Sequence, residues 1–94
     1  MDSTKKSYLY QNDPNPFGSL TTIKYYIDEI STINSSFIEI RDLMDILKST
    51  IPVSDESGIG QVNFNGNNLI NGFYVYSLKI NGVSKDSKLL LIEH

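Results

Sequence analysis

Short stretches in which apolar and polar residues alternate, separated by Gly, Asn and Pro, run through most of the chain. The clearest are Leu20–Ile27 and residues 73–80, where every second position is apolar or aromatic. A period of two places such residues on one face of a β-strand, so both stretches predict half-buried strands. The residues expected to face the core are Ile23, Tyr25, Ile27, Tyr74, Tyr76, Leu78 and Ile80, and Tyr26 is expected on the outer face.

The strand at 73–80 is followed directly by Asn81-Gly82 and then by the apolar-rich stretch Val83–Ile92. Asn-Gly favours the positive φ angles of a type I′ turn, so the C-terminal third predicts a β-hairpin. Residues 61–65 form a further short alternating strand with Val62 and Phe64 facing inward. A short strand is also expected at 8–10, and the Gly- and Ser-containing residues 53–60 are expected to form a polar loop.

The middle of the chain, residues 36–51, fits two different structures. Apolar residues at helical spacing, a capping box and a following proline favour a helix. The alternative is two strands, 37–41 and 46–51, joined by a turn at 42–45. Local rules favour the helix slightly, whereas the strand-rich surroundings favour the hairpin. The helical features are Phe37, Ile40, Met44, Leu47 and Ile51 on one face, Ser36 with Glu39 as the box, and Pro52 as the stop.

About seven short strands with turns every 8–12 residues are typical of an antiparallel sandwich. The chain has 94 residues and neither an internal repeat nor a linker that would divide it. We therefore predict one domain with an all-β, immunoglobulin-like fold, an antiparallel β-sandwich of about seven strands.

Composition argues against catalysis and against several kinds of partner. The chain has no cysteine, a single histidine at position 94 and a formal charge of −3. These residues offer little material for a nucleophile–base pair or a transition-metal site, and no clustered basic surface for nucleic acid. The longest apolar run, residues 89–92, is far shorter than the roughly 20 residues that span a bilayer. We predict no enzyme activity, catalytic residue, cofactor, metal, nucleic-acid partner or membrane span.

Two weak motifs are better explained by turns. Residues 58–60 (G-I-G) resemble the start of a dinucleotide-binding loop, but the third glycine and the βαβ context are missing. The pairs Asp55/Glu56 and Asp42/Asp45 lack the spacing of calcium ligands. We interpret the first as a plain turn and the acids as solvated turn residues.

A proline-rich segment at residues 9–17, L-Y-Q-N-D-P-N-P-F, stands apart from the strand pattern. Pro14 and Pro16 fix φ and favour extended geometry at Asp13 and Asn15, so Phe17 would project from a stiff elbow. Two roles are compatible with this geometry. The segment could be a rigid structural element that covers one end of a sandwich, or it could also be read by a receptor.

The same segment, followed by T-T-I-K-Y-Y-I at 21–27, closely resembles the opening of the type A C-terminal sorting domain of the type IX secretion system. That family begins with a Q-N-x-P-N-P-F segment and a T-x-I-x-Y strand. The resemblance continues in order at 38–42, 66–69, 72–78 and 87–92. The family usually has Gly after the Asp of its first hairpin, where this chain has Met44-Asp45; Asp tolerates a left-handed φ, so the turn can survive. The family's final basic residues are replaced here by Glu93-His94.

The resemblance implies a role in export rather than a reaction. Residues 8–94 would be a non-catalytic C-terminal secretion signal, and residues 1–7 a linker on the cleavage side. The signal would be recognised at the outer-membrane translocon and removed by the system's sortase. Its partners would be the outer-membrane shuttle and sortase proteins and an N-terminal cargo domain of the same chain. It would pass through the periplasm before the product reaches the outer-membrane surface or is secreted. The resemblance also favours the two-strand interpretation of 36–51.

A folded signal needs rigid landmarks, and the resemblance together with the strand pattern suggests which residues provide them. The residues expected to contact the translocon are Asn15, Pro16, Phe17, Gly72, Tyr74 and Lys88. The alternative function is an immunoglobulin-like adhesion or spacer module that stays on a cell-surface protein. In that case Tyr26 and the Asn-rich stretch 63–71 would touch glycans or a neighbouring protein.

Overall fold

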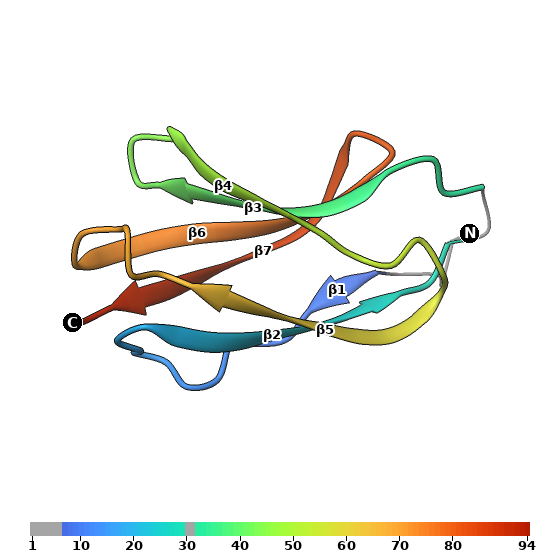
Figure 1. The fold of residues 1–94 in the computed structure, drawn as a ribbon. Helices are drawn as coiled ribbons and strands as arrows, with labels where there is room; N and C mark the ends of the chain where they lie inside the picture. The colour runs from blue at the N-terminus through green and yellow to red at the C-terminus, as the bar shows by residue number, and fades with distance from the viewer. Residues whose placement is uncertain (1–6, 30–31) are drawn as a thin grey trace.

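Two antiparallel sheets packed face to face make up the domain (Figure 1). The structure, a computed structural model, describes residues 7–29 and 32–94. Within these residues there are seven strands and no helix. Residues 1–6 of the expected linker lie outside the described residues, whereas Ser7 is buried and its hydroxyl donates to Glu29 Oε2 at 2.8 Å.

The strand order has the immunoglobulin-like pattern. One sheet has the order β1-β2-β5 and the other the order β4-β3-β6-β7, and all strand pairs are antiparallel. The chain changes sheet after β2, after β4 and after β5, as in a Greek-key sandwich. The predicted fold class is therefore confirmed. The strands are β1 (Tyr8–Leu9), β2 (Leu20–Ile27), β3 (Ser36–Asp42), β4 (Leu47–Pro52), β5 (Gly58–Asn65), β6 (Gly72–Ile80) and β7 (Val83–Ile92).

The core lies between the sheets and consists of the inward-facing residues that the alternation predicts. All seven predicted members on β2 and β6 are buried, and Phe64 of β5 joins them. Val62 is half-buried and packs against this core. The rest of the core comes from both ends of the chain and from β3: Leu9, Phe17, Ile38, Ile40, Leu90 and Ile92.

The ambiguous middle of the chain forms a hairpin, so the two-strand interpretation is confirmed and the helix is wrong. Cross-strand pairing with β6 on one side and β4 on the other satisfies the backbone of β3. The connecting turn depends on Asp42, whose Oδ1 accepts hydrogen bonds from the backbone N–H groups of Met44 and Ile46, both at 2.9 Å. Asp45 takes a left-handed φ of 68°, as expected for the position where the resembled family has glycine.

The Asn81-Gly82 turn joins β6 to β7, with φ angles of 52° and 80° that fit the predicted type I′ geometry. Asn81 also holds the β2–β3 connection in place. Its side-chain oxygen accepts from Asn34 N at 2.6 Å, and its Nδ2 donates to Thr32 O at 2.9 Å.

The expected loop over 53–60 is partly wrong, because β5 begins at Gly58 and the G-I-G motif is a strand rather than a turn. Gly60 pairs with Tyr25 of β2 across the sheet. A Cβ at position 60 would overlap the phenol ring of Tyr25, which is 4% exposed. The glycine is therefore needed to make room for a core aromatic ring, and this packing accounts for a glycine within a regular strand.

Candidate recognition surface

The proline-rich residues 9–17, called the leader segment below, run along the outer edge of β7. Its first half pairs with β2 of the three-stranded sheet, where Tyr10 N donates to Lys24 O and Asp13 forms a bridge with Thr22. At its end, Phe17 and Ile92 form a parallel bridge, so there the segment extends the four-stranded sheet. An uncovered edge strand is a template for unwanted pairing, and the leader segment occupies it here. Five hydrogen bonds join the segment to β7 and to Glu93, the residue that follows this strand: Leu9 N to Asp86 Oδ2 (2.8 Å), Gln11 Nε2 to Leu89 O (2.7 Å), Leu91 N to Asn15 Oδ1 (2.9 Å), Phe17 N to Leu91 O (3.1 Å) and Glu93 N to Phe17 O (2.9 Å).

Asn12 fixes the shape of the leader segment from inside. It is 2% exposed, and its Nδ2 donates to Pro14 O and to Thr21 Oγ1, both at 3.1 Å. Thr21, also buried, donates its hydroxyl to Pro14 O at 2.7 Å. The peptide bonds before Pro14 and Pro16 are both cis. These contacts give Asn12 and Thr21, two residues of the resembled motif, structural roles.

Tyr76 anchors the leader segment to the core. Its hydroxyl accepts from Asn12 N at 2.9 Å and donates to Tyr10 O at 2.8 Å, while the ring is fully buried between the sheets. Burial raises the pKa of this phenol from 10.0 to about 12, because the charged form would lose its hydration. The sequence pattern predicted Tyr76 as a core residue but gave no sign of this polar contact.

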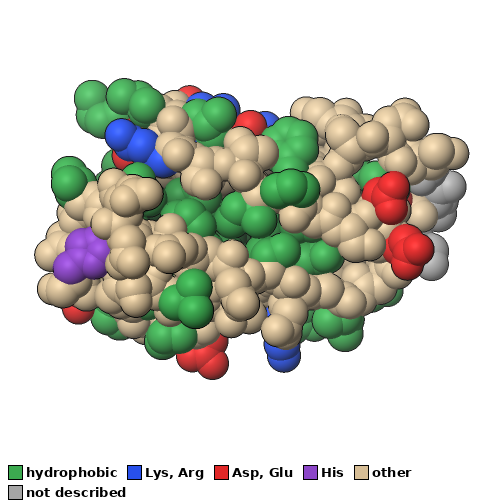
Figure 2. Space-filling view, in the orientation of Figure 1, with side chains coloured by type: hydrophobic (Ala, Val, Ile, Leu, Met, Phe, Trp, Pro, Cys, Tyr) green, Lys and Arg blue, Asp and Glu red, His purple; other side chains and the backbone are tan. Residues whose placement is uncertain are grey.

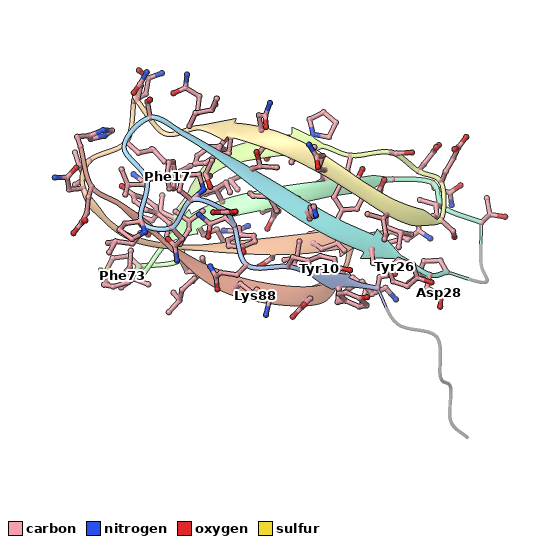
Figure 3. All side chains as sticks on the ribbon, turned by 90° about the horizontal axis from the view of Figure 1, so that it is seen from below. Tyr10, Phe17, Tyr26, Asp28, Phe73 and Lys88 are labelled. Carbon is pink, nitrogen blue, oxygen red and sulfur yellow. The ribbon has the colours of Figure 1, made fainter. Side chains whose placement is uncertain are left out.

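Most of the predicted recognition residues meet around the C-terminal half of β7. Asn15 and Phe17 contact it from the leader segment, while Gly72 and Tyr74 lie opposite Ile92 and Leu90 on the neighbouring β6. Phe17 and Tyr74 are each 3% exposed, so their rings pack in the core (Figure 3 labels Phe17). Burial raises the pKa of the Tyr74 phenol, whose hydroxyl donates to Ile70 O at 2.7 Å.

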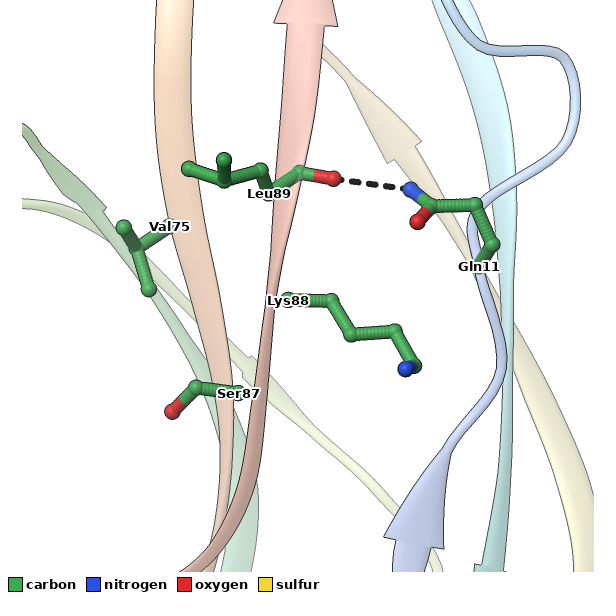
Figure 4. A pocket seen from close by; sticks show the side chains of 5 residues that line it. All are labelled: Gln11, Val75, Ser87, Lys88 and Leu89. Carbon is green, nitrogen blue, oxygen red and sulfur yellow. Dashed lines mark hydrogen bonds between the residues drawn. The ribbon is translucent and has the colours of Figure 1, made fainter.

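The other predicted residues leave atoms at the surface. Asn15 and Pro16 are exposed, and Gly72 is half-buried with a φ of 149°, a conformation that favours glycine. Lys88 is half-buried, and its side chain extends from β7 toward the leader segment (Figure 4). A partner can therefore touch Asn15, Pro16 and Lys88 directly, whereas Phe17 and Tyr74 would act only by holding the surface in place.

Two shallow depressions flank the leader segment, and Gln11 lines both. The first, of about 430 Å³, lies over β6 and β7 beside Lys88 (Figure 4). The second, of about 410 Å³, lies over β2 and β5 beside Lys24. Neither lysine forms an ion pair with any residue that the structure describes. The leader segment is thus a ridge with an available ammonium group on each side, a feature that the sequence analysis did not identify for Lys24.

Tyr26, the residue expected to contact glycans in the alternative function, belongs to a cluster of three tyrosines. Its ring centroid lies 5.2 Å from that of Tyr8, which lies 5.4 Å from that of Tyr10. The Asn-rich stretch is not part of this site. Tyr26 pairs with Ile59, but Asn65 pairs with Leu20 at the other end of β2, roughly 20 Å away at about 3.4 Å per residue.

The four acidic residues considered as calcium ligands either have structural partners or are exposed in a loop. Asp42 accepts two turn amides and lies 3.8 Å from Lys48 Nζ, and Asp45 Oδ1 lies 3.8 Å from Arg41 Nε. Asp55 and Glu56 are exposed in the β4–β5 connection. Residues 7–29 and 32–94 contain no group of three or more His, Cys, Asp or Glu side chains that could hold a metal ion.

Comparisons with known proteins add no relative. No family model matches the chain, and no curated protein shows significant similarity to it. The part of the chain that the structure describes contains no helix long and apolar enough to cross a membrane.

Proposed function

We propose that this domain is a non-catalytic secretion signal of the type IX kind, recognised at an outer-membrane translocon and removed by a sortase. The observation that carries the proposal is the leader segment. Its Q-N-x-P-N-P-F pattern is the most specific part of the resemblance, and it forms an ordered ridge on the edge of β7. A receptor that reads this motif would meet backbone and side-chain atoms in fixed positions.

The geometry suits a signal that has to be folded when it is read. The leader segment occupies the edge of β7, which lowers the tendency of that edge to pair with other chains. Asn12, Thr21 and Tyr76 hold the segment through buried hydrogen bonds. Pre-ordering of this kind reduces the conformational entropy that a binding surface loses when a partner docks. The ridge, with Lys24 and Lys88 beside it, is the surface that we assign to recognition.

The two ends of the described chain lie at opposite ends of the sandwich (Figure 1). Ser7 contacts Asp28 and Glu29 just after β2, whereas His94 contacts Leu69 and Asn71 at the far end. A cargo domain on the N-terminal side would therefore leave the C-terminal end of the sandwich accessible. Under the proposal, the sortase acts on the N-terminal side of Ser7, away from that end.

Export of a reporter tests the proposal. A fluorescent protein carrying an inner-membrane export signal is fused ahead of this chain and expressed in a host with a type IX system. We expect the reporter at the cell surface or in the medium, and in the periplasm when the translocon gene is deleted. A reporter that stays in the periplasm of the intact host, or leaves the translocon mutant equally well, would overturn the proposal.

Matched lysine variants test the assigned surface. Lys88→Gln removes an ammonium that lies beside the leader segment and has no ion-pair partner among residues 7–29 and 32–94. Lys48→Gln removes an ammonium of the β3–β4 hairpin that lies 3.8 Å from Asp42. We expect Lys88→Gln to lower export several-fold and Lys48→Gln to leave it unchanged. Thermal unfolding should show that both variants fold like the parent. Equal export of the two variants would remove Lys88 from the recognition surface.

The tyrosine cluster supports a second candidate function, an adhesion or spacer module retained on a surface protein. Tyr8 and Tyr10 are 39% and 37% exposed, and exposed aromatic rings can stack on sugar faces. Glycan-array binding that is lost in Tyr10→Ala, together with retention of the domain on the mature reporter, would favour this function over the secretion signal.

A further inference from the structure

The outer face of the four-stranded sheet divides into a polar half and an apolar half. In the polar half, Glu39 of β3 lies beside Ser77 of β6, which lies beside Ser87 of β7. Nearer the C-terminal end of the domain, the corresponding row contains Val75 of β6 and Leu89 of β7. Phe73 lies two residues before Val75 on β6, closer still to that end. Leu47 of β4 extends this row on the other side of Arg41. The apolar residues of this half therefore lie on β4, β6 and β7, and β3 contributes Arg41.

The β3–β4 turn continues the apolar half beyond the strands. Its residues Leu43, Met44 and Ile46 are 65%, 80% and 55% exposed, although turns of this kind are usually polar. Figure 2 shows hydrophobic side chains gathered at the end of the molecule where this turn lies, and Figure 3 places Phe73 at that same end. The end patch is defined here as Leu43, Met44, Ile46, Leu47, Phe73 and Leu89.

The end patch is large for a protein of this size. Its other members, Leu47, Phe73 and Leu89, are 46%, 51% and 50% exposed. With roughly 150–200 Å² for each side chain, the patch presents on the order of 600 Å². The largest apolar patch on a typical monomer covers about 300–600 Å², and patches of this size commonly mark interaction sites.

The charges within and around the end patch balance each other. Arg41 Nε lies 3.1 Å from Glu39 Oε1, and its Nη1 donates to the backbone carbonyl of Asp45 at 2.9 Å. Lys48 and Asp42 form a second pair at 3.8 Å. A patch of one sign would repel a second copy of itself, whereas this neutral arrangement does not.

We propose that the end patch is a self-association surface, at which two copies of this chain pack their four-stranded sheets face to face. A two-fold arrangement would bring the same patch of each copy together. The area buried would be on the order of 1,200 Å², counting both copies, which is at the lower limit for a specific interface. The dimer would therefore be weak, with exchange between monomer and dimer at micromolar concentrations. The patch lies away from Ser7, so an N-terminal domain would not cover it.

Sedimentation velocity over roughly 1 µM to 1 mM tests this proposal. The parent chain should shift from monomer to dimer within the range. Met44→Ser and Leu89→Ser change exposed side chains at two separate places on the patch, so each should fold normally. Each is expected to raise the dissociation constant at least about tenfold. Ile59→Ser is the matched control, because Ile59 is 71% exposed but lies on β5 in the other sheet.

Two results would overturn the proposal. The first is a parent chain that stays monomeric throughout the concentration range; loss of reporter export in Met44→Ser would then make the export machinery the occupant of the patch. The second is association that persists in both patch variants, and its loss in Ile59→Ser would assign the contact to the edge of β5. A failure of export for every chain would concern only the proposed function, since self-association is measured on the purified protein.

Discussion

Replacing Tyr76 by Phe tests how the leader segment is held. The change removes a single oxygen that accepts from Asn12 N and donates to Tyr10 O. The ring itself is fully buried and keeps its packing. Two hydrogen bonds at about 1 kcal/mol each predict a loss of about 2 kcal/mol in the free energy of unfolding at pH 7. For a domain of this size, that loss lowers the Tm by about 8–16 °C.

The raised pKa of the Tyr76 phenol makes the free energy of unfolding fall at high pH. Burial raises this pKa to about 12 from the ordinary value of 10.0. Between these values the unfolded chain releases the phenol proton while the folded chain keeps it, so the contribution to stability is full below pH 10 and lost as pH rises toward 12. At pH 11 the free energy of unfolding of the parent should have fallen by roughly 1 kcal/mol, whereas Tyr76→Phe has no phenol proton to lose and should not show this fall. The difference between the two proteins should therefore shrink from about 2 to about 1 kcal/mol.

Urea unfolding of both proteins at pH 7 and pH 11, followed by circular dichroism, measures this difference. Thr22→Val is the control, because it removes only an exposed hydrogen bond from Thr22 Oγ1 to Asn63 and no titrating group. Its effect should be small and equal at the two pH values. A difference between parent and Tyr76→Phe that stays constant or widens at pH 11 would refute the assignment of the buried phenol as the anchor.

Three further substitutions test individual contacts by urea unfolding. Gly60→Ala forces a Cβ into the buried ring of Tyr25 and should lower the free energy of unfolding by more than about 2 kcal/mol. In the control Gly18→Ala the new Cβ meets nothing closer than 3.6 Å, so the loss should be far smaller. Equal losses would contradict the packing of Tyr25 over Gly60. Asp45→Gly removes the strain of a left-handed φ of 68° and should stabilise the chain by about 0.5–1 kcal/mol, whereas Met44→Gly should give no gain. Destabilisation by Asp45→Gly would show that the contact of Asp45 with Arg41 contributes more to stability than the strain costs. Asn15→Ala should cost about 1 kcal/mol and speed hydrogen exchange of the Leu91 amide, with Asn15→Asp keeping the acceptor; unchanged exchange in Asn15→Ala would exclude the Asn15–Leu91 contact.

Much of the fold follows from local pattern. Local pattern predicts the exact bounds of two strands, because period and turn chemistry are properties of neighbouring residues. The alternation at Leu20–Ile27 gives β2, and the Asn81-Gly82 turn gives the start of β7 at Val83–Ile92. The start of β5 at Gly58 could not be found in this way. β5 begins there because Gly58 pairs with Ile27 of β2, and Gly60 fits the strand because the ring of Tyr25, 35 positions away in the sequence, covers it when the two strands pair.

The candidate site was predictable in composition but not in arrangement. The prolines and Phe17 marked the leader segment as a rigid element, and the sequence left open whether it is structural or read by a partner. Its contact with β7 depends on residues more than 70 positions apart, such as Asn15, whose side chain accepts from the backbone N–H of Leu91. The periodicity of a strand carries no information on contacts between residues so far apart in the sequence. For the same reason, the position of Lys24 beside the leader segment could not be predicted from the sequence.

The intact mass of an exported reporter tests the central claim most directly. Mass spectrometry of the reporter recovered from the cell surface or medium would show whether the domain has been removed. A cleaved secretion signal predicts a mass lower than that of the whole fusion by at least residues 8–94, with the remaining cargo ending on the N-terminal side of the sandwich. Recovery of the reporter outside the cell at the full mass of the fusion would contradict the account and identify the domain as a retained surface module.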